Sequence, residues 1–460
     1  MESFTLNAKV EVLGMTDVLI IGAGPAGLCA AIAAARSGVR ALLIEQNACS
    51  GGMATAGLVG PFMTCYDKSG ERMIIRGLFE EIVDRLVAKG GALHPSGIPS
   101  GSAFTSWIGP GHSHVTPFEP EVLKTVADGM LRESGVRVLY HTRFVKALME
   151  GNAVTGAVIH SKSGLQAVHA RVIVDCSGDA DVAADAGAAF ELGRHGTMQP
   201  ATMFFRIGNV DSAKLEAEIR ANLHAFHREN GVNYRSFHWR VAEARAAGDW
   251  NLERVSIGMF RGVKPDEWSI NTSRIMGVDG TDAESLTEAE MEGRRQAAEI
   301  FSFIRKYLPG CGNAVLLSTA STVGIRETRH VRGDHVLTVD DVLDGRVAED
   351  SILLAANSVD VHGRFGPLSN EYLTIRDGEW YGVPYRCLLP LGIENLLVAG
   401  RSVSAESDAA GAVRVMPPCM GMGQAAGTAA AMAVRQGLLP RRLDAAALRT
   451  ALRENRVFLG

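Results

Sequence analysis

The feature that most restricts the fold of this chain is a glycine pattern that directly follows a short apolar run. The run DVLII (residues 17–21) is followed by GAGPAG (residues 22–27). The spacing G-x-G-x-x-G between a buried strand and a helix is typical of a dinucleotide-binding βαβ unit. Gly22 permits a tight turn, Gly24 leaves room for a pyrophosphate at the helix end, and Gly27 lets helix and strand pack closely.

The residues after the glycines complete such a unit. An alanine-rich stretch predicts a helix over residues 25–37, and a second apolar run predicts a strand over residues 40–45. This strand ends at Glu45, where a carboxylate can accept hydrogen bonds from the ribose hydroxyls. Strand, helix and acid together disfavour a glycine turn that binds nothing. The unit alone leaves NAD and FAD open.

Two later regions indicate that the two ends of the chain build one domain. Alternating runs at 136–140, 145–149, 153–160, 166–169 and 172–174 predict a β-meander. Near the end, an apolar strand (395–400) stops at Gly400, and a helix follows Pro417 and Pro418. Later glycine elements could supply the further contacts that a bound flavin needs, which favours FAD over NAD. The fold class is therefore predicted as α/β, a Rossmann-like FAD-binding domain with a parallel sheet and a β-meander, plus an inserted α+β substrate or capping domain.

The predicted domain boundaries follow from these patterns. Residues 14–65, 117–188 and 385–460 are assigned to a discontinuous cofactor domain, and residues 66–116 and 189–384 to the substrate or capping domain. In the latter, strands are expected around 202–207 and helices at 212–230 and 288–307.

Composition excludes several classes of function. The chain has 460 residues, with 46 Lys and Arg against 51 Asp and Glu and a net charge of -5. This balance argues against a nucleic-acid partner. The seven cysteines are scattered without a C-x-x-C pair, so we expect no disulfide framework and no metal site, and a reducing cytoplasm fits best.

The sequence offers no clear membrane or export signal. Residues 1–4 begin no basic, apolar leader. Two apolar stretches, 18–35 and 419–434, are predicted as buried elements of the nucleotide-binding domain and not as membrane spans.

Several motifs together resemble a known superfamily. They are residues 22–27, the GGMAT loop (51–55), Gly178-Asp179, GIRETR (324–329), VPYRC (383–387) and residues 396–427. In this combination the chain resembles the FAD-dependent oxidoreductases of the glutathione-reductase-like superfamily. Within it, the chain resembles the branch related to fumarate reductase and succinate dehydrogenase flavoproteins and to the flavin subunit of heterodisulfide reductase. The resemblance covers nearly the whole chain and implies FAD as the cofactor.

The resemblance implies which residues hold the FAD. Gly22, Gly24, Gly27 and Glu45 would hold the ADP half, and Gly51, Gly52 and Met53 would pass near the phosphates and the flavin. Gly178 belongs to the same motif set, and Val145 would contact adenine through its backbone. Gly400 and Arg401 stand at the ribityl and phosphate contact, although an acid is common where Arg401 stands. Cys419 and Met420, in the first turn after the two prolines, would direct backbone N–H groups at the flavin.

Two arginines are the first candidates for substrate binding. Arg414 lines up with an arginine that binds the substrate carboxylate in fumarate-reductase-like enzymes, and a guanidinium can clamp a planar anion through two parallel hydrogen bonds. Arg326 belongs to a charged cluster with Glu327 and Arg329 that borders the flavin face in the resembling branch. A purely structural ion-pair role is the alternative for both arginines.

A proton-transfer group is harder to assign. His362 stands two residues after Asp360, so both side chains share one face of an extended strand, and an Asp-supported imidazole can act as a general acid or base. A structural role for His362 is the alternative. Many relatives carry a histidine where this chain has Ser407. His112, His114, His195 and Tyr385 are weaker candidates.

We therefore expect a FAD-dependent dehydrogenase or reductase that transfers hydride between flavin N5 and a small polar, anionic organic substrate. Two alternatives stay open, an electron-transfer flavoprotein subunit of a larger complex and an NAD(P)H-dependent flavin monooxygenase or reductase. No second G-x-G-x-x-G pattern follows a strand, so we expect no built-in nicotinamide domain, and an external electron donor or acceptor is left open. A homo-oligomer is also left open.

Overall fold

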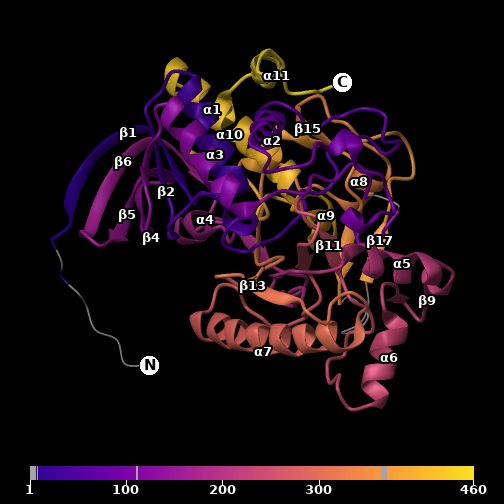
Figure 1. Ribbon diagram of the computed structural model, residues 1–460. Coiled ribbons are helices and arrows are strands. Elements are labelled where there is room, and N and C mark those ends of the chain that lie inside the picture. The colour runs from indigo at the N-terminus through magenta and orange to yellow at the C-terminus, as the bar shows by residue number, and fades with distance from the viewer. Residues whose placement is uncertain (1–6, 8, 110–111, 364–369) are drawn as a thin grey trace.

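The computed structural model has two layers, with the nucleotide-binding sheet in one and a smaller mixed domain in the other (Figure 1). It describes residue 7 and residues 9–109, 112–363 and 370–460. Residues 1–4, on which the expectation about a leader rests, lie outside this part of the chain.

The larger layer is built on a seven-stranded sheet with the order β3-β2-β1-β6-β5-β4, in which β19 also pairs with β6. The pairs β1–β2, β1–β6, β2–β3 and β6–β19 are parallel, whereas β4–β5 and β5–β6 are antiparallel. Its strands are β1 (Glu11–Ile21), β2 (Ala41–Ile44), β3 (Arg137–Leu139), β4 (Arg143–Glu150), β5 (Ala153–Ser161), β6 (Gly164–Asp175) and β19 (Leu396–Val398). The predicted α/β fold class with a parallel sheet and a meander is confirmed.

The meander differs in detail from its prediction. The run at 136–140 is strand β3, which leaves the meander and extends the parallel part of the sheet beside β2. The runs at 166–169 and 172–174 are one long strand, β6. The first half of β6 pairs with β5, and its last residues pair with β19, so one strand serves both parts of the sheet.

Two helices from opposite ends of the chain pack side by side against the sheet. Helix α1 (Pro25–Arg36) contacts α10 (Met416–Gln436) (Figure 1). The approach is close because α10 carries glycines at the contact: an added Cβ at Gly423 would lie 2.0 Å from the Ala26 carbonyl oxygen, and one at Gly427 would lie 2.1 Å from that of Ala30. Of the two apolar stretches, residues 18–35 thus form the end of β1 and most of α1, and residues 419–434 lie in α10.

The smaller layer contains a four-stranded antiparallel sheet with the order β11-β12-β8-β13, covered by the long helix α7. Its elements are β8 (Phe205–Gly208), β11 (Met259–Arg261), β12 (Trp268–Ile270), β13 (Val315–Thr319), α5 (Ser212–Asn222), α6 (His238–Ala246) and α7 (Ala283–Tyr307). The predicted helix over 212–230 was too long: α5 ends at Asn222, and a hairpin of β9 (His227–Glu229) and β10 (Val232–Tyr234) follows. The glycine at the hairpin turn, Gly231, has φ +78°, which a helix does not accommodate.

The remaining elements lie around these two layers. They are α2 (Leu78–Ala88), α3 (Pro120–Glu133), α4 (Asp181–Asp185), α8 (Val339–Leu343), α9 (Ser407–Val413), α11 (Ala445–Glu454), β7 (Phe190–Leu192), β14 (Arg329–Val331), β15 (Ser351–Ala355), β16 (Val359–His362), β17 (Asn370–Leu373) and β18 (Tyr381–Pro384).

The hydrophobic cores place some segments in another domain than the predicted domain boundaries do. Residues of α2, β15 and β18 pack in the same core as α1 and α10, although they fall in ranges assigned to the capping domain. Trp107 packs with β8 and β12 in the core of the smaller layer. The exact division into domains stays a prediction.

None of the helices in the described part of the chain is long and apolar enough to span a membrane.

Candidate active site

A cavity of about 590 Å³ runs from the glycine turn after β1 into the space between the two layers. Its walls come from segments spread over the chain, including the ends of β1, β2 and β6, the loop after β19, and loops of the smaller layer. The residues discussed below that line it are Gly22, Gly24, Glu45, Gly52, Met53, His112, Phe144, Gly178, Asp179, Asp181, Arg235, Arg254, Arg326, Asp360, His362, Tyr372, Gly400, Arg401, Arg414 and Cys419.

At one end of the cavity, the glycine turn leaves backbone exposed at the start of α1. Gly24 precedes α1, and an added Cβ there would meet no protein atom within 4 Å. Gly22 has φ +92°, which its lack of a side chain permits. The open space over Gly24 and the positive end of α1 suit a pyrophosphate.

Glu45 lies at the end of β2, as its position in the sequence predicts. Its carboxylate is buried and accepts hydrogen bonds from the backbone N–H of Ala23 (2.6 Å) and of Asn47 (2.8 Å). These bonds hold the acid against the glycine turn and at the cavity wall.

The end of β6 carries a second buried acid, which the sequence analysis did not single out. Asp175 is fully buried and accepts bonds from the backbone N–H groups of Ser177 (3.0 Å), Val182 (2.9 Å) and Ala183 (3.0 Å). Burial raises its pKa, which these hydrogen bonds oppose. Asp175 thereby shapes the loop that brings Gly178 to the cavity.

On the C-terminal side, Arg401 lines the cavity and forms a salt bridge with Asp179 of this loop. Its guanidinium donates to Asp179 Oδ1 at 2.7 Å, and the same oxygen accepts a 2.7 Å bond from Thr328. Cys419, in the first turns of α10, lines the cavity as well. Arg401, which stands where the resembling family commonly has an acid, thus has Asp179 of this chain as its partner.

Further from the glycine turn, three neighbouring arginines line the cavity. Burial lowers the pKa of Arg326 to about 9, and repulsion from Arg414 and Arg254 adds to this lowering. Arg326 donates to the Pro200 carbonyl, and Arg414 donates to Gln199 Oε1 (3.2 Å) and to the Asp360 carbonyl (3.0 Å). Within the described residues, none of the three guanidinium groups forms a salt bridge with a carboxylate.

The packing of α9 explains how Arg414 reaches this position. Gly411 of α9 lies against β16, where an added Cβ would be 2.8 Å from the Asp360 carbonyl oxygen. Helix α9 ends at Val413, so Arg414 follows it directly and lies at the cavity beside Asp360.

Asp360 and His362 share one face of β16, as predicted. His362 Nε2 lies 3.1 Å from Asp360 Oδ2, and its Nδ1 lies 3.1 Å from Arg274 Nη2. A guanidinium only donates, so Nδ1 accepts and Nε2–H donates to the carboxylate.

Burial lowers the pKa of His362 to about 4, so the ring is neutral near pH 7. Although burial opposes ionisation, His362, Arg414 and Arg326 lower the pKa of Asp360, which is therefore charged.

Ser407, which replaces the histidine of many relatives, lies off the cavity wall in a buried cluster. It donates to Glu327 Oε2 at 2.7 Å, and His330 Nε2 lies 3.2 Å from the same oxygen. Burial raises the pKa of Glu327, but the bonds from His330 and Ser407 outweigh it and leave the pKa lowered. The predicted charged cluster is thus divided: Arg326 lines the cavity, Glu327 is internal, and Arg329 bonds to Asp181 at 3.0 Å.

A tyrosine and a histidine meet at the cavity wall from distant parts of the chain. Tyr372 Oη of β17 lies 2.6 Å from Nδ1 of His112, which belongs to the loop before α3. Burial is the main reason why the pKa of Tyr372 is raised, so the phenol keeps its proton. Of the weaker histidine and tyrosine candidates, His114, His195 and Tyr385 do not line this cavity.

Comparison with known proteins supplies the family. The model of the family described as FAD dependent oxidoreductase matches residues 17–452. The chain belongs to this family. It is an enzyme with FAD as its cofactor, as the sequence analysis expected.

Individual relatives are distant. A match to sarcosine oxidase subunit alpha from Corynebacterium sp. (strain P-1) is 62% identical over 37 residues, which are 8% of this chain and 4% of that subunit. Among solved structures, p-nitrophenol 4-monooxygenase PnpA from Pseudomonas putida DLL-E4 is 13% identical, with 96% of this chain and 86% of that chain covered and a TM-score of 0.46. A geranylgeranyl bacteriochlorophyll reductase-like protein from Thermoplasma acidophilum is 14% identical, with 97% and 84% covered and a TM-score of 0.43.

The residues around the glycine turn fit the FAD of this oxidoreductase family. The open space over Gly24, the acid Glu45 at the end of β2 and the start of α10 at Cys419 would hold its phosphates, ribose and flavin ring, respectively. Of the predicted cofactor residues, those on the cavity wall are Gly22, Gly24, Glu45, Gly52, Met53, Gly178, Gly400, Arg401 and Cys419.

Four predicted cofactor residues do not line the cavity. Gly27 is a packing residue, since an added Cβ would lie 1.7 Å from the Gly22 carbonyl oxygen. Gly51 supports the loop by donating to the Ala23 carbonyl (2.7 Å). Val145 points outward with 46% of its surface exposed, while Phe144 lines the cavity, and Met420 is buried within α10.

Within the described residues, no group of three or more His, Cys, Asp or Glu could hold a metal ion. The cavity residues that sequence reasoning missed, chiefly Arg235, Arg254 and Tyr372, come from irregular segments or short strands without a motif, so no local pattern pointed to them.

Proposed function

We propose that this FAD-dependent oxidoreductase acts as a dehydrogenase or reductase on a small organic anion. The observation that carries the proposal is the row of three arginines, Arg254, Arg326 and Arg414, which share a cavity with the cofactor residues and lack carboxylate partners within the described residues. Arginine stays protonated in proteins, so these charges are not removed by proton loss. An anionic ligand would neutralise them.

The balance of charge along the cavity supports an anion over a neutral substrate. A fourth arginine, Arg235, lines the same cavity, whereas Asp360 is the acid nearest to the row and already bonds to His362. The remaining lining acids, Glu45, Asp179 and Asp181, lie on the cofactor side. A carboxylate entering this region would gain charge-assisted, partly bidentate hydrogen bonds.

Bound FAD supplies the two-electron chemistry. The chain's part is to orient the substrate and to exchange one proton. Arg414 lies on the cofactor side of the row, because its carbonyl accepts a hydrogen bond from Cys419 Sγ at 3.2 Å, so it would hold the carboxylate beside the reacting carbon. Its position also supports the finer proposal of a relation to the fumarate reductase branch.

For the proton, we favour Tyr372 over His362. Both nitrogens of His362 are engaged, by Asp360 and by Arg274, so the ring is suited to orienting those charges. The Tyr372 hydroxyl keeps its proton at neutral pH, and the neighbouring His112 could replace that proton after transfer. In this proposal the second substrate, an electron donor or acceptor, is external.

Anaerobic reduction of the flavin tests this function. The purified holoenzyme would be mixed without oxygen with small organic acids, alcohols, amines and NAD(P)H, and then with candidate acceptors. We expect an organic acid to bleach the oxidised flavin band, or to reoxidise the reduced flavin in the reverse direction. Bleaching by NAD(P)H alone, with no response to any acid in either direction, would contradict the proposal and favour the monooxygenase or reductase alternative.

A further inference from the structure

Gln199 lies next to the row of arginines, in the segment between β7 and β8, but is not itself part of the cavity wall. Its side chain is buried, and its oxygen accepts two hydrogen bonds, from Arg414 Nη2 at 3.2 Å and from the backbone N–H of His362 at 3.1 Å. Because both neighbours are donors, the amide must face them with its oxygen. Gln199 thereby joins Arg414 to strand β16.

The nitrogen of the same amide has no such role. In the part of the chain that the structure describes, Gln199 Nε2 is buried without a hydrogen-bond partner. A buried, unpaired amide N–H is unfavourable, because it leaves water without gaining an acceptor. The contribution of this side chain is therefore its oxygen.

The backbone of Gln199 is held by a buried acid, Glu327. The Gln199 N–H donates to Glu327 Oε1 at 2.8 Å, and Glu327 Oε2 accepts from Ser407 at 2.7 Å. Burial opposes the charge of Glu327, but the bonds from His330 and Ser407 outweigh it, so the pKa is lowered and the acid is ionised. Gln199 is thus bonded through its backbone to a carboxylate and through its side chain to a guanidinium.

These contacts fix Arg414 without neutralising it. Both of its side-chain hydrogen bonds use Nη2, one to Gln199 and one to the Asp360 carbonyl at 3.0 Å, and neither acceptor is charged. Glu327 attracts Arg414 as well, although the two form no ion pair within the described residues. A neutral oxygen on Gln199 therefore takes the place that a carboxylate would otherwise fill.

We propose that Gln199 is a positioning residue that fixes Arg414 in the cavity through a neutral acceptor and keeps its charge available to the substrate. The inference rests on the function proposed above, in which Arg414 binds an organic anion. Without the Gln199 oxygen, the guanidinium is free to turn toward Glu327 and to pair with it. A substrate carboxylate would then have to displace an internal ion pair before it could bind. Gln199 acts only through Arg414 and does not touch the substrate.

A double-mutant cycle on the holoenzyme tests this role, with acetate as the probe and the visible flavin spectrum as the readout. Gln199→Met keeps the length of the side chain, removes the acceptor, and should weaken acetate binding at least about tenfold with FAD retained. In an Arg414→Gln background the same substitution should weaken binding by less than about twofold, because no guanidinium is left to position.

Gln424→Met is the matched control for the loss of a buried glutamine. The Gln424 oxygen accepts from the backbone N–H of Leu78 at 2.8 Å, and neither residue lines the cavity. This variant should lose stability but bind acetate within about twofold of wild type. Should Gln199→Met not fold, Gln199→Asn, which is one methylene shorter, takes its place.

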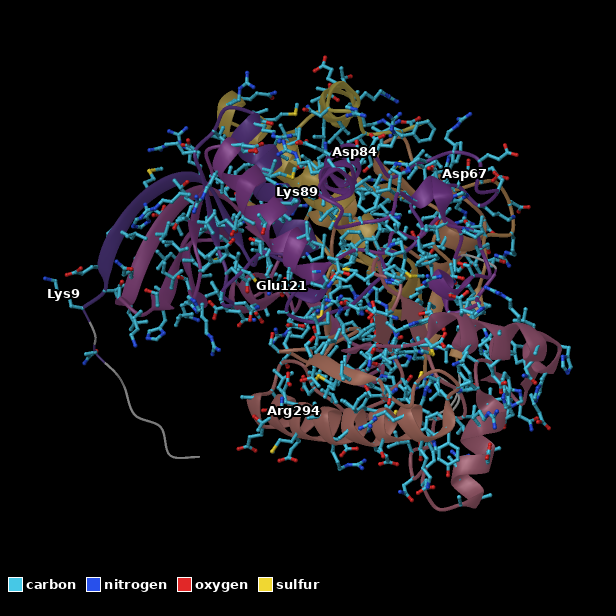
Figure 2. All side chains as sticks on the ribbon, in the orientation of Figure 1. Lys9, Asp67, Asp84, Lys89, Glu121 and Arg294 are labelled. Atoms are coloured by element: carbon cyan, nitrogen blue, oxygen red, sulfur yellow. The ribbon has the colours of Figure 1, made fainter. Side chains whose placement is uncertain are left out.

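The midpoint potential of the flavin is a second readout that needs no ligand. Arg414 lies beside Cys419 at the predicted flavin contact, so its unpaired charge should stabilise the reduced flavin. Arg414→Gln and Gln199→Met should each lower the potential, and the double variant should lower it no further. Arg294→Gln removes an equal charge from an exposed position on α7 and should leave the potential unchanged (Figure 2).

The inference is overturned if Gln199→Met changes neither acetate binding nor the potential, or if the effects of the Gln199 and Arg414 substitutions add. A wild-type flavin that responds to no organic acid would contradict the proposed function instead, and the potentials of the same four proteins would still decide the role of Gln199. An unchanged potential in Arg414→Gln, together with no response to acids, would overturn both.

Discussion

At the scale of single residues, the described wall of the cavity carries more arginines than acids. Arg326 and Arg414 satisfy part of their hydrogen bonding on carbonyl and amide oxygens of Pro200, Gln199 and Asp360, and, in the part of the chain that the structure describes, not on carboxylates. Such bonds position a guanidinium without cancelling its charge, which leaves it available to an anion.

The first prediction concerns these two arginines. Arg326→Gln and Arg414→Gln should each weaken binding of the anionic substrate by about 10- to 100-fold, because each loses a charge-assisted contact. FAD content should not change. Arg346→Gln is the control, since Arg346 is an exposed cation paired with Asp341 and Asp344. Loss of FAD in Arg414→Gln would reassign that residue to the cofactor.

The second prediction concerns proton transfer. Tyr372→Phe removes the hydroxyl and should lower the rate of flavin reduction by substrate at least about 100-fold. Substrate affinity, measured from the flavin spectrum, should change little. Tyr66→Phe is a matched control, because Tyr66 also lies against a histidine, His114 (4.1 Å between ring centres), but neither lines the cavity. A normal rate in Tyr372→Phe, with a slow rate in His362→Gln, would return the role to His362.

The third prediction is a pH dependence of stability. The pKa of His362 is about 4 in the fold and 6.5 in the unfolded chain, so between these values only the unfolded chain binds the proton. The contribution of His362 to stability therefore falls as the pH falls from 6.5 to 4, by up to roughly 3 kcal/mol. Thermal unfolding of wild type and His362→Gln at pH 7 and pH 5 measures this. We expect wild type to lose more stability than the variant; equal losses would contradict the buried, neutral imidazole.

At the scale of elements, glycines serve two separate purposes in the cofactor domain. Gly24 has open space where a side chain would stand, while Gly427 on α10 touches the backbone of α1. The first position leaves room for the cofactor and the second allows two helices to pack.

The fourth prediction separates these purposes. Gly24→Ala should fold normally, because its φ of -63° suits alanine and no atom lies within 4 Å, but it should bind FAD at least about tenfold more weakly. Gly427→Ala should destabilise the protein by about 1–3 kcal/mol through overpacking. Thermal unfolding and flavin content distinguish the two variants. A stable, FAD-saturated Gly24→Ala protein would remove Gly24 from the cofactor site.

Elements with strong local sequence patterns were predictable. The pairing of strands that are far apart in the sequence was not. The glycine turn, the helix predicted over 25–37 and the strand ending at Glu45 have patterns that depend only on neighbours in the chain. Strand β3 was placed in the meander because its alternation resembles that of β4 and β5, whereas its partner, β2, lies far back in the sequence. The end of α5 was missed because the hairpin turn at Gly231 is a weak local signal.

At the scale of the whole molecule, the site is a product of topology. Residues 24, 112, 254, 326, 372 and 414 line one cavity, although they come from distant parts of the chain. The sequence predicted Arg326, His362 and Arg414 through motif and resemblance. Arg254 and Tyr372 stand in segments without a motif, so only the assembled fold identifies them.

The central claim is that the chain holds FAD beside a site whose arginines select an anion. The most direct test is titration of the oxidised holoenzyme with pairs of small ligands that differ only in a carboxylate or the matching neutral amide, followed by the visible flavin spectrum. We predict that carboxylates perturb the flavin bands saturably and that the amides bind at least about 100-fold more weakly. A protein without flavin, or one that responds equally to acid and amide, would contradict the account.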